Sequence, residues 1–118
     1  MNKETVIQRE IMIALSKEGC KVFRNETGGF WTGKVIHKDG RTVTLANAQM
    51  MQCGLCVGSS DIIGITPNGK FIAIEVKTET GRVTKEQITF INNILSSGGI
   101  AGIARSVADA LELLSRHQ

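Results

Sequence analysis

The sequence contains no tyrosine, one proline, one tryptophan and only 4% aromatic residues in 118 positions. Proteins that bind single-stranded nucleic acid by base stacking use rows of aromatic side chains, so this composition argues against such a platform. No apolar run approaches the roughly 18 residues that a membrane-spanning helix needs, and we therefore expect no membrane partner. Residues 1–4 also lack the basic and then apolar layout that begins a secretory signal peptide.

Cysteine is scarce too, with three residues, an odd number without the spacing of a disulfide framework. This usage favours a reducing cytosol over secretion. Cys53 and Cys56 form a C-x-x-C pair, but structural zinc needs four ligands and the remaining Cys and His residues are irregularly spaced. We interpret the pair as two small, partly buried thiols rather than a zinc site.

The composition that remains is typical of one globular domain. Apolar residues make up 42% of the chain and charged residues 21%, and we expect a single domain over residues 1–118. A core of this size can hold one sheet and two or three helices. The net charge of +3 permits a polyanionic partner without requiring one.

The hydrophobic pattern predicts an α/β fold in the order helix, strand, hairpin, strand, strand, helix, strand, helix. The predicted elements are helices over Lys3–Lys17, Thr84–Leu95 and the residues after Ser106, strands over Cys20–Asn25, Asp61–Ile65, Lys70–Lys77 and Ile100–Arg105, and a hairpin over Trp31–Leu45. Residues 46–58 show no clear period. A turn at residues 66–69 predicts an antiparallel pair, and the final strand–helix–strand unit predicts a parallel one. We therefore expect a mixed sheet flanked by helices.

One charge pair stands out in the strand Lys70–Lys77. Because side chains alternate along a strand, Glu75 and Lys77 share one face, about 6–7 Å apart, and Ile74 lies on the core face. A solvated strand face is the simpler interpretation of this pair taken alone.

A second carboxylate changes that interpretation. If the turn is a three-residue loop that ends at Gly69, the register places Asp61 opposite Glu75. Two facing carboxylates repel each other unless a cation lies between them, and oxygen ligands suit Mg²⁺ or Mn²⁺. A slip of one residue would put Asp61 on the other face of the sheet.

A third carboxylate, Glu10, falls between Val6 and Ala14 on the apolar stripe predicted for the first helix. Buried glutamate is rare unless it is paired, so Glu10 is a candidate ligand for the same ion. The alternative is a glutamate at the edge of the stripe that reaches solvent.

These residues resemble the D-x(n)-E-x-K signature of the PD-(D/E)xK nuclease superfamily and, more closely, the VRR-NUC (virus-type replication-repair nuclease) family. The matching places are Glu10, the Gly58–Asp61 run, the Ile74–Lys77 strand, Gly81 with the Thr84–Gln87 run, and the short glycine-bounded strand after that helix. Ser60 stands where the family pattern has proline. The resemblance implies a restriction-endonuclease-like fold.

The resemblance also implies roles for individual residues. The implied ligands of a divalent metal ion are three carboxylates and one backbone carbonyl, on Glu10, Asp61, Glu75 and Val76. Lys77 would position or deprotonate the attacking water or stabilise charge on the phosphate, and Gln87 would orient Lys77 or the water. A capping-box glutamine that satisfies a backbone N–H is the alternative for Gln87, and the two roles are compatible.

Three carboxylates repel DNA, so phosphates must be held by other residues. The candidate phosphate-binding residues are Arg24, Lys34, Lys38, Arg41, Arg82 and Lys85. The last two stand near a helix start whose free N–H groups also attract phosphate, and the hairpin would be a projecting contact to the DNA backbone. For each cation alone, a solvated surface charge is the simpler interpretation.

We therefore expect a Mg²⁺- or Mn²⁺-dependent DNA endonuclease. The small stand-alone form resembles phage-encoded members of the family, which are thought to act on branched DNA such as four-way junctions, as in DNA repair, in the cytoplasm of a bacterium or host cell. Cutting two strands symmetrically needs two active sites, so we predict a homodimer on branched or duplex DNA. The alternatives are a catalytically silent nucleic-acid-binding or assembly domain, and a restriction-type or RNA-processing nuclease on the same fold.

Overall fold

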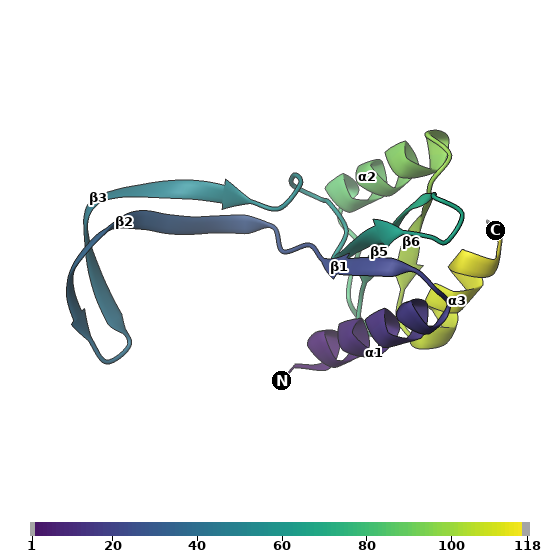
Figure 1. The fold of residues 1–118 in the computed structure, drawn as a ribbon, viewed down its shortest axis with the longest axis horizontal. Coiled ribbons are helices and arrows are strands. Elements are labelled where there is room, and N and C mark those ends of the chain that lie inside the picture. Colours follow the sequence, from purple (N-terminus) through teal and green to yellow (C-terminus); the bar gives the residue numbers. More distant parts are fainter. Residues whose placement is uncertain (1, 117–118) are drawn as a thin grey trace.

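The computed structural model describes residues 2–116. Its elements are α1 (Lys3–Lys17), β1 (Lys21–Arg24), β2 (Gly28–Asp39), β3 (Thr42–Cys53), β4 (Ile62–Ile65), β5 (Phe71–Val76), α2 (Lys85–Ser96), β6 (Ile100–Ala104) and α3 (Val107–Arg116). Both the α/β class and the element order agree with the prediction. In Figure 1, β2 and β3 project from a body that contains the other elements. No helix within the described residues is long and apolar enough to span a membrane.

The body is a four-stranded mixed sheet with helices on both faces. Its strand order is β1-β4-β5-β6, with antiparallel pairs except for the parallel pair β5–β6. Alternate residues of β5 point to opposite faces: Ile74 packs in a core with Ile11 of α1 and Leu114 of α3, whereas Ala73 packs with Ile91 of α2. The sheet is thus enclosed on both sides, and only its ends are free to form a site.

The turn between β4 and β5 fixes the register of the two strands. Gly69 has a φ of 84°, which favours glycine, and its N–H donates to the Thr66 carbonyl at 2.9 Å. The Thr66 N–H donates to the Lys70 carbonyl at 2.9 Å, as the predicted three-residue loop requires. The last paired residues are Ile62 and Ile74, so the next position places Asp61 opposite Glu75. The predicted register is confirmed.

The apolar stripe of α1 differs from the prediction. Ile11 and Leu15 are fully buried and Ile7 packs against them, at the four-residue spacing of one helix face. Val6, which the prediction placed on the stripe, is 40% exposed. The buried stripe is therefore rotated toward the larger aliphatic side chains, and this rotation decides which carboxylate of α1 reaches the site.

The hairpin is longer than predicted. It spans β2 and β3 rather than Trp31–Leu45, and residues 46–53, which show no clear period in the sequence, form two thirds of β3. The pairing is interrupted by register shifts after Thr32 and after Val35. Nearly all of its side chains are exposed, so neither face selects an alternating pattern, and the bulges break any alternation that remains. The hairpin extends the molecule to 52 Å, against 29 and 28 Å along the other axes.

Candidate functional site

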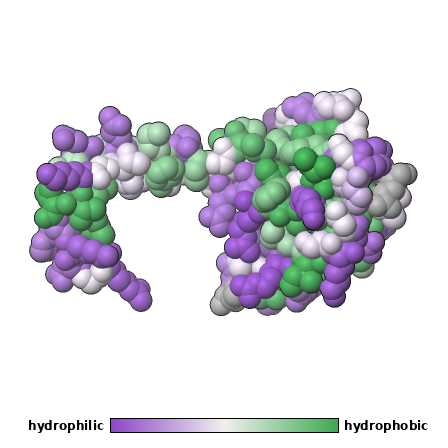
Figure 2. All heavy atoms as spheres, viewed as in Figure 1, coloured by the Kyte–Doolittle hydropathy of each residue, from purple (hydrophilic) through white to green (hydrophobic). Residues whose placement is uncertain are grey.

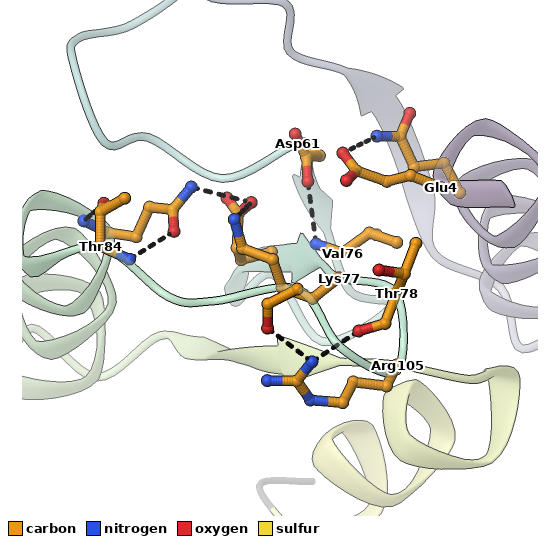
Figure 3. Close-up of polar contacts among 11 residues, drawn as sticks. Glu4, Asp61, Val76, Lys77, Thr78, Thr84 and Arg105 are labelled. Carbon is orange, nitrogen blue, oxygen red and sulfur yellow. Dashed lines mark hydrogen bonds and ion pairs between the residues drawn. The ribbon is translucent and has the colours of Figure 1, made fainter. Parts of the chain in front are cut away.

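Two carboxylates meet at the end of the sheet where β4 begins and β5 ends. Asp61 directly precedes β4, and its Oδ2 accepts a hydrogen bond from the Val76 N–H at 2.9 Å. Glu75 is the last but one residue of β5. In Figure 3, Asp61 and Val76 lie between the start of α2, at Thr84, and the part of α1 that carries Glu4. The loop before β4 thus places the Asp61 side chain against the end of β5, the strand that carries Glu75.

Glu75 is held by two neighbours and is only 3% exposed. Gln87 Nε2 donates to Glu75 Oε2 at 3.1 Å, and Lys77 Nζ lies 3.6 Å from the same oxygen. The Lys77 side chain is 13% exposed, so it is mostly buried but not closed off from solvent. The expected placement of Glu75 and Lys77 on one face agrees with this contact.

The charges and the burial around Glu75 together favour its protonated form. The pKa of Glu75 is raised from its usual 4.5 to about 8, chiefly because the carboxyl is buried, and further by its hydrogen bond with Asp61 and the charge of that residue. The charge of Lys77 lowers the pKa of Glu75 and that of Glu4 raises it, and both effects are smaller. At neutral pH Glu75 therefore keeps a proton, because its burial and the neighbouring Asp61 outweigh the charge of Lys77.

The carboxylate that α1 contributes is Glu4, and the expectation of Glu10 is wrong. Glu4 lies three residues before Ile7 and seven before Ile11, so it extends the buried stripe toward the site, where it raises the pKa of Glu75. Glu10 is exposed. Six helical residues turn the chain by about 600°, so the side chains of Glu4 and Glu10 point about 120° apart around α1 and do not share a face. The signal for Glu4 was its spacing to Ile7 and Ile11.

Gln87 has the capping role considered for it, and its amide also contacts the carboxyl of Glu75. Its Oε1 accepts from the Thr84 N–H at 2.9 Å while Thr84 Oγ1 accepts from the Gln87 N–H at 3.1 Å, which completes a capping box. Its Nε2 contacts Glu75 rather than Lys77. The cap at the start of α2 thereby fixes the direction from which the amide approaches the carboxyl.

Arg105 is a residue that the sequence did not single out. Figure 3 shows two contacts of its guanidinium, in which Nη1 donates to the carbonyls of Thr78 at 2.6 Å and Gly81 at 2.8 Å. A longer contact of the same nitrogen reaches the Glu79 carbonyl at 3.4 Å. These carbonyls belong to the loop that leads from Lys77 to α2. A lone arginine after a short strand carries no pattern that reveals such a contact in advance.

The six predicted phosphate-binding residues lie in three regions. Arg24 lines a polar pocket of about 340 Å³ together with Asp61, Thr5 and Gln8. The hairpin carries three exposed cations, and the segment around the start of α2 carries two: Lys34, Lys38 and Arg41, then Arg82 and Lys85. Arg24 thus shares a pocket with a site carboxylate.

The donor set suits a hard divalent cation, although it is not assembled as a finished cage. Within residues 2–116, no three His, Cys, Asp or Glu side chains form a group ready to hold a metal ion. Asp61 and Glu75 nevertheless face each other, Glu75 holds a proton because burial and its neighbour Asp61 raise its pKa, and Glu4 adds negative charge nearby. A cation in place of that proton would relieve the same repulsion, so carboxylate oxygens of this kind fit Mg²⁺ or Mn²⁺.

The C-x-x-C pair lies outside this site. Cys53 and Cys56 are both free and exposed, so the expectation of partly buried thiols is wrong. Cys53 Sγ donates to the Glu26 carbonyl at 3.5 Å. Cys53 is the last residue of β3, and Cys56 lies in the loop that follows it.

Comparisons with known proteins agree with the fold described above. A family model described as the VRR-NUC domain matches residues 2–108. A solved structure described as a VRR_NUC domain superposes with a TM-score of 0.62 at 17% identity, and the alignment covers 100% of both chains. At that identity the likeness shows the fold alone. Comparison with curated proteins gives no match.

Proposed function

The chain belongs to the VRR-NUC family, a nuclease family, and from this membership and the site geometry we propose that it is a metal-dependent DNA endonuclease specific for branched DNA such as four-way junctions. The observation that carries the proposal is the placement of Asp61 opposite Glu75, with Lys77 Nζ 3.6 Å from Glu75 Oε2. A protein that only binds nucleic acid gains nothing from clustered anions, whereas phosphodiester hydrolysis needs them to hold a cation.

The metal ligands that we propose are the facing carboxylates, the Val76 carbonyl and, from α1, Glu4 in place of Glu10. Mg²⁺ or Mn²⁺ held there would supply a water of lowered pKa and positive charge beside the phosphate oxygens. Gln87 donates to Glu75 Oε2, and the Val76 N–H donates to Asp61 Oδ2, so each carboxylate has one oxygen fixed by the protein. The other oxygen of each remains to bind the ion.

Lys77 is the group that we propose faces the phosphate. Its ammonium keeps donors that Glu75 does not use, and its side chain is 13% exposed, so a bound phosphate can reach it. Charge develops on the phosphate oxygens in the transition state, and a fixed ammonium beside them lowers the barrier. Lys77 therefore stabilises charge or positions the attacking water.

Phosphates farther along the DNA would meet the cations outside the site. The hairpin holds its three cations on an arm that projects from the body, so they contact backbone that the site itself does not reach (Figure 1). Arg24, Arg82 and Lys85 would hold phosphates closer to the carboxylates.

We further propose that the functional unit is a homodimer joined through the hairpin. Seven large apolar side chains of the hairpin are 45–61% exposed: Phe30, Trp31, Val35, Ile36, Val43, Met50 and Met51. Figure 2 shows apolar side chains along this arm, away from the body. Neighbouring side chains such as Phe30 and Trp31 point to opposite faces of the hairpin, so a partner that wraps around the arm would cover more of them than one that packs on a single face. An isolated two-stranded hairpin is marginally stable in water, which also favours a covering partner.

The nuclease proposal is tested with labelled junction, flap, duplex and RNA substrates in Mg²⁺. We expect the wild type to cleave the junction first, Asp61→Asn to lose more than about a hundredfold in rate, and the exposed hairpin variant Asp39→Asn to match the wild type. Binding without cleavage would overturn the proposal in favour of a silent binding domain. Preferred cleavage of RNA or plain duplex would overturn the branched-DNA assignment.

The dimer is tested by light scattering at micromolar concentration. We expect twice the monomer mass for the wild type and the monomer mass for Trp31→Ser combined with Met50→Ser, since these two residues face each other across the hairpin. A monomeric wild type would contradict the proposed assembly and leave the nuclease assignment intact.

A further inference from the structure

Asn25 is a buried polar residue that the chemistry above does not use. It follows β1 and is 8% exposed. Its backbone N–H donates to the Asp61 carbonyl at 2.7 Å. Its side-chain Nδ2 donates to Ser59 Oγ at 2.8 Å and to the Ser60 carbonyl at 2.9 Å. One residue thus makes three hydrogen bonds to the three consecutive residues that end at the site aspartate.

These contacts follow from the pairing of β1 with β4. The last paired residues are Arg24 and Ile62, so Asn25 and Asp61 occupy the next position of the same ladder, just beyond the strand ends. The backbone bond extends the pairing by one residue. The side-chain amide then offers two donors to two acceptors, which an aspartate or a leucine of similar size cannot do.

The segment that Asn25 holds is a loop pinned between two elements. Residues 54–60 form neither helix nor strand. Gly58 has a φ of +86°, and a Cβ at this position would lie 2.5 Å from the Glu86 carbonyl oxygen, so the loop packs tightly on α2 there. Ser59 is 6% exposed and Ser60 is fully buried. Water cannot easily replace hydrogen bonds in such surroundings, so Asn25 is the main polar support on the β1 side.

Asp61 is consequently anchored at both of its ends. Its carbonyl oxygen is held by Asn25, and its carboxylate Oδ2 is held by the Val76 N–H. We propose that Asn25 is a positioning residue, which keeps the Asp61 carboxylate facing Glu75 and thereby sets the affinity of the site for a divalent cation. This inference rests on the proposed function for its ion.

The test compares Asn25→Leu and Asn25→Asp with Asn92→Leu, a control at an exposed position on α2. Calorimetric titration of the full chain with Mn²⁺ is expected to show a dissociation constant about tenfold higher for both Asn25 variants and unchanged for the control. In junction cleavage, kcat should fall about tenfold and KM for DNA should stay within about twofold, because Asn25 acts through Asp61. A general loss of structure would not separate the two constants in this way.

Two further measurements keep the proposal open to refutation. In metal-free protein, amide hydrogen exchange over residues 59–62 should be faster in Asn25→Leu and unchanged elsewhere in the sheet. If Asn25→Leu does not fold, Ser59→Ala, which removes one of the three bonds, should shift the Mn²⁺ dissociation constant in the same direction by a smaller factor.

The outcomes separate the two proposals. The positioning role would be overturned if a folded Asn25→Leu protein had wild-type Mn²⁺ affinity and wild-type hydrogen exchange, even if the wild type cleaves junctions. If Asn25→Leu does not fold, the same result for Ser59→Ala would overturn it. If the wild type cleaves none of the substrates, the nuclease assignment is overturned. Weaker Mn²⁺ binding and faster hydrogen exchange in Asn25→Leu would still support the role of Asn25.

Discussion

Gln87 and Glu75 are joined by a hydrogen bond of 3.1 Å from the Nε2 of the amide to Oε2 of the carboxyl. The other end of the same amide accepts from the Thr84 N–H and closes the capping box of α2. The start of a helix and a buried acid of the neighbouring strand are therefore linked through one side chain. This arrangement lets the structural and the functional roles of Gln87 be separated by substitution.

Gln87→Glu should keep the helix cap and impair the site. Glutamate accepts from the Thr84 N–H as well as glutamine does, so the helix cap should be kept and any loss in the free energy of unfolding should come from the contact with Glu75. It cannot donate to Glu75 and adds a charge beside it, so the cleavage rate should fall about tenfold or more. Urea unfolding and single-turnover cleavage measure the two effects.

The matched variant is Thr84→Ala, which removes the cap acceptor and leaves the Gln87 donor in place. It should lose about 1 kcal/mol of stability with little change in cleavage rate well below the melting temperature. Equal cleavage by Gln87→Glu and wild type would show that the bond to Glu75 has no functional part.

The raised pKa of Glu75 predicts a pH dependence of stability. Because the folded state holds this proton more tightly than the unfolded chain, its contribution is full below about pH 4.5 and is lost as the pH rises through about 8. The melting temperature of the metal-free protein should therefore fall from pH 6 to pH 8.5. Glu75→Gln, which does not titrate, should lack this part of the fall.

Metal binding should show the opposite trend with pH. The proton on Glu75 must leave before the carboxylate binds a cation, so the rise in melting temperature caused by Mn²⁺ should grow from pH 6 to pH 8. Glu75→Gln should abolish the Mn²⁺ effect, whereas Glu112→Gln, in an exposed ion pair with Arg116, should retain it. A Mn²⁺ effect that stays the same at all pH values would contradict the assignment of Glu75 as a ligand.

The sequence was sufficient to predict the β4–β5 hairpin and its register because the signals there are local. The turn chemistry around Gly69 and the alternation in Phe71–Val76 act over a few residues, and they place Asp61 opposite Glu75 without knowledge of the rest of the chain. The capping box at Thr84 is equally local, and the structure shows it as predicted.

The features that were wrong depend on contacts distant in sequence. The helix α1 has apolar residues on more than one side, including exposed Val6 and Ile13, so its periodicity does not single out the buried face. Packing on β5 and α3 selects Ile7, Ile11 and Leu15, and that choice turns Glu4 rather than Glu10 toward the site. The long hairpin was underestimated because it packs against no core that would impose a pattern.

Exchanging the two candidate carboxylates of α1 for amides tests this assignment directly. Glu4→Gln should raise the Mn²⁺ concentration needed for half-maximal cleavage about tenfold, because it removes negative charge next to Asp61 and Glu75. Glu10→Gln, on the same helix and exposed, should leave it within about twofold. A larger effect of Glu10→Gln would show that the helix turns differently in the active protein.

Arg105→Met should destabilise the loop between Lys77 and α2. The variant leaves the carbonyls of Thr78 and Gly81 without their charged donor, and hydrogen bonds to charged groups contribute about 1.5–3 kcal/mol, so we expect a loss of about 2 kcal/mol in urea unfolding. Arg116→Met removes an arginine from an exposed pair and should cost less than about 0.5 kcal/mol. Arg105→Lys should recover only part of the loss, because the shorter lysine side chain does not carry its ammonium as far as Nη1. If Arg105→Met unfolds at the same urea concentration as Arg116→Met, the loop is held by its own turn at Gly81 and the guanidinium contacts add nothing measurable.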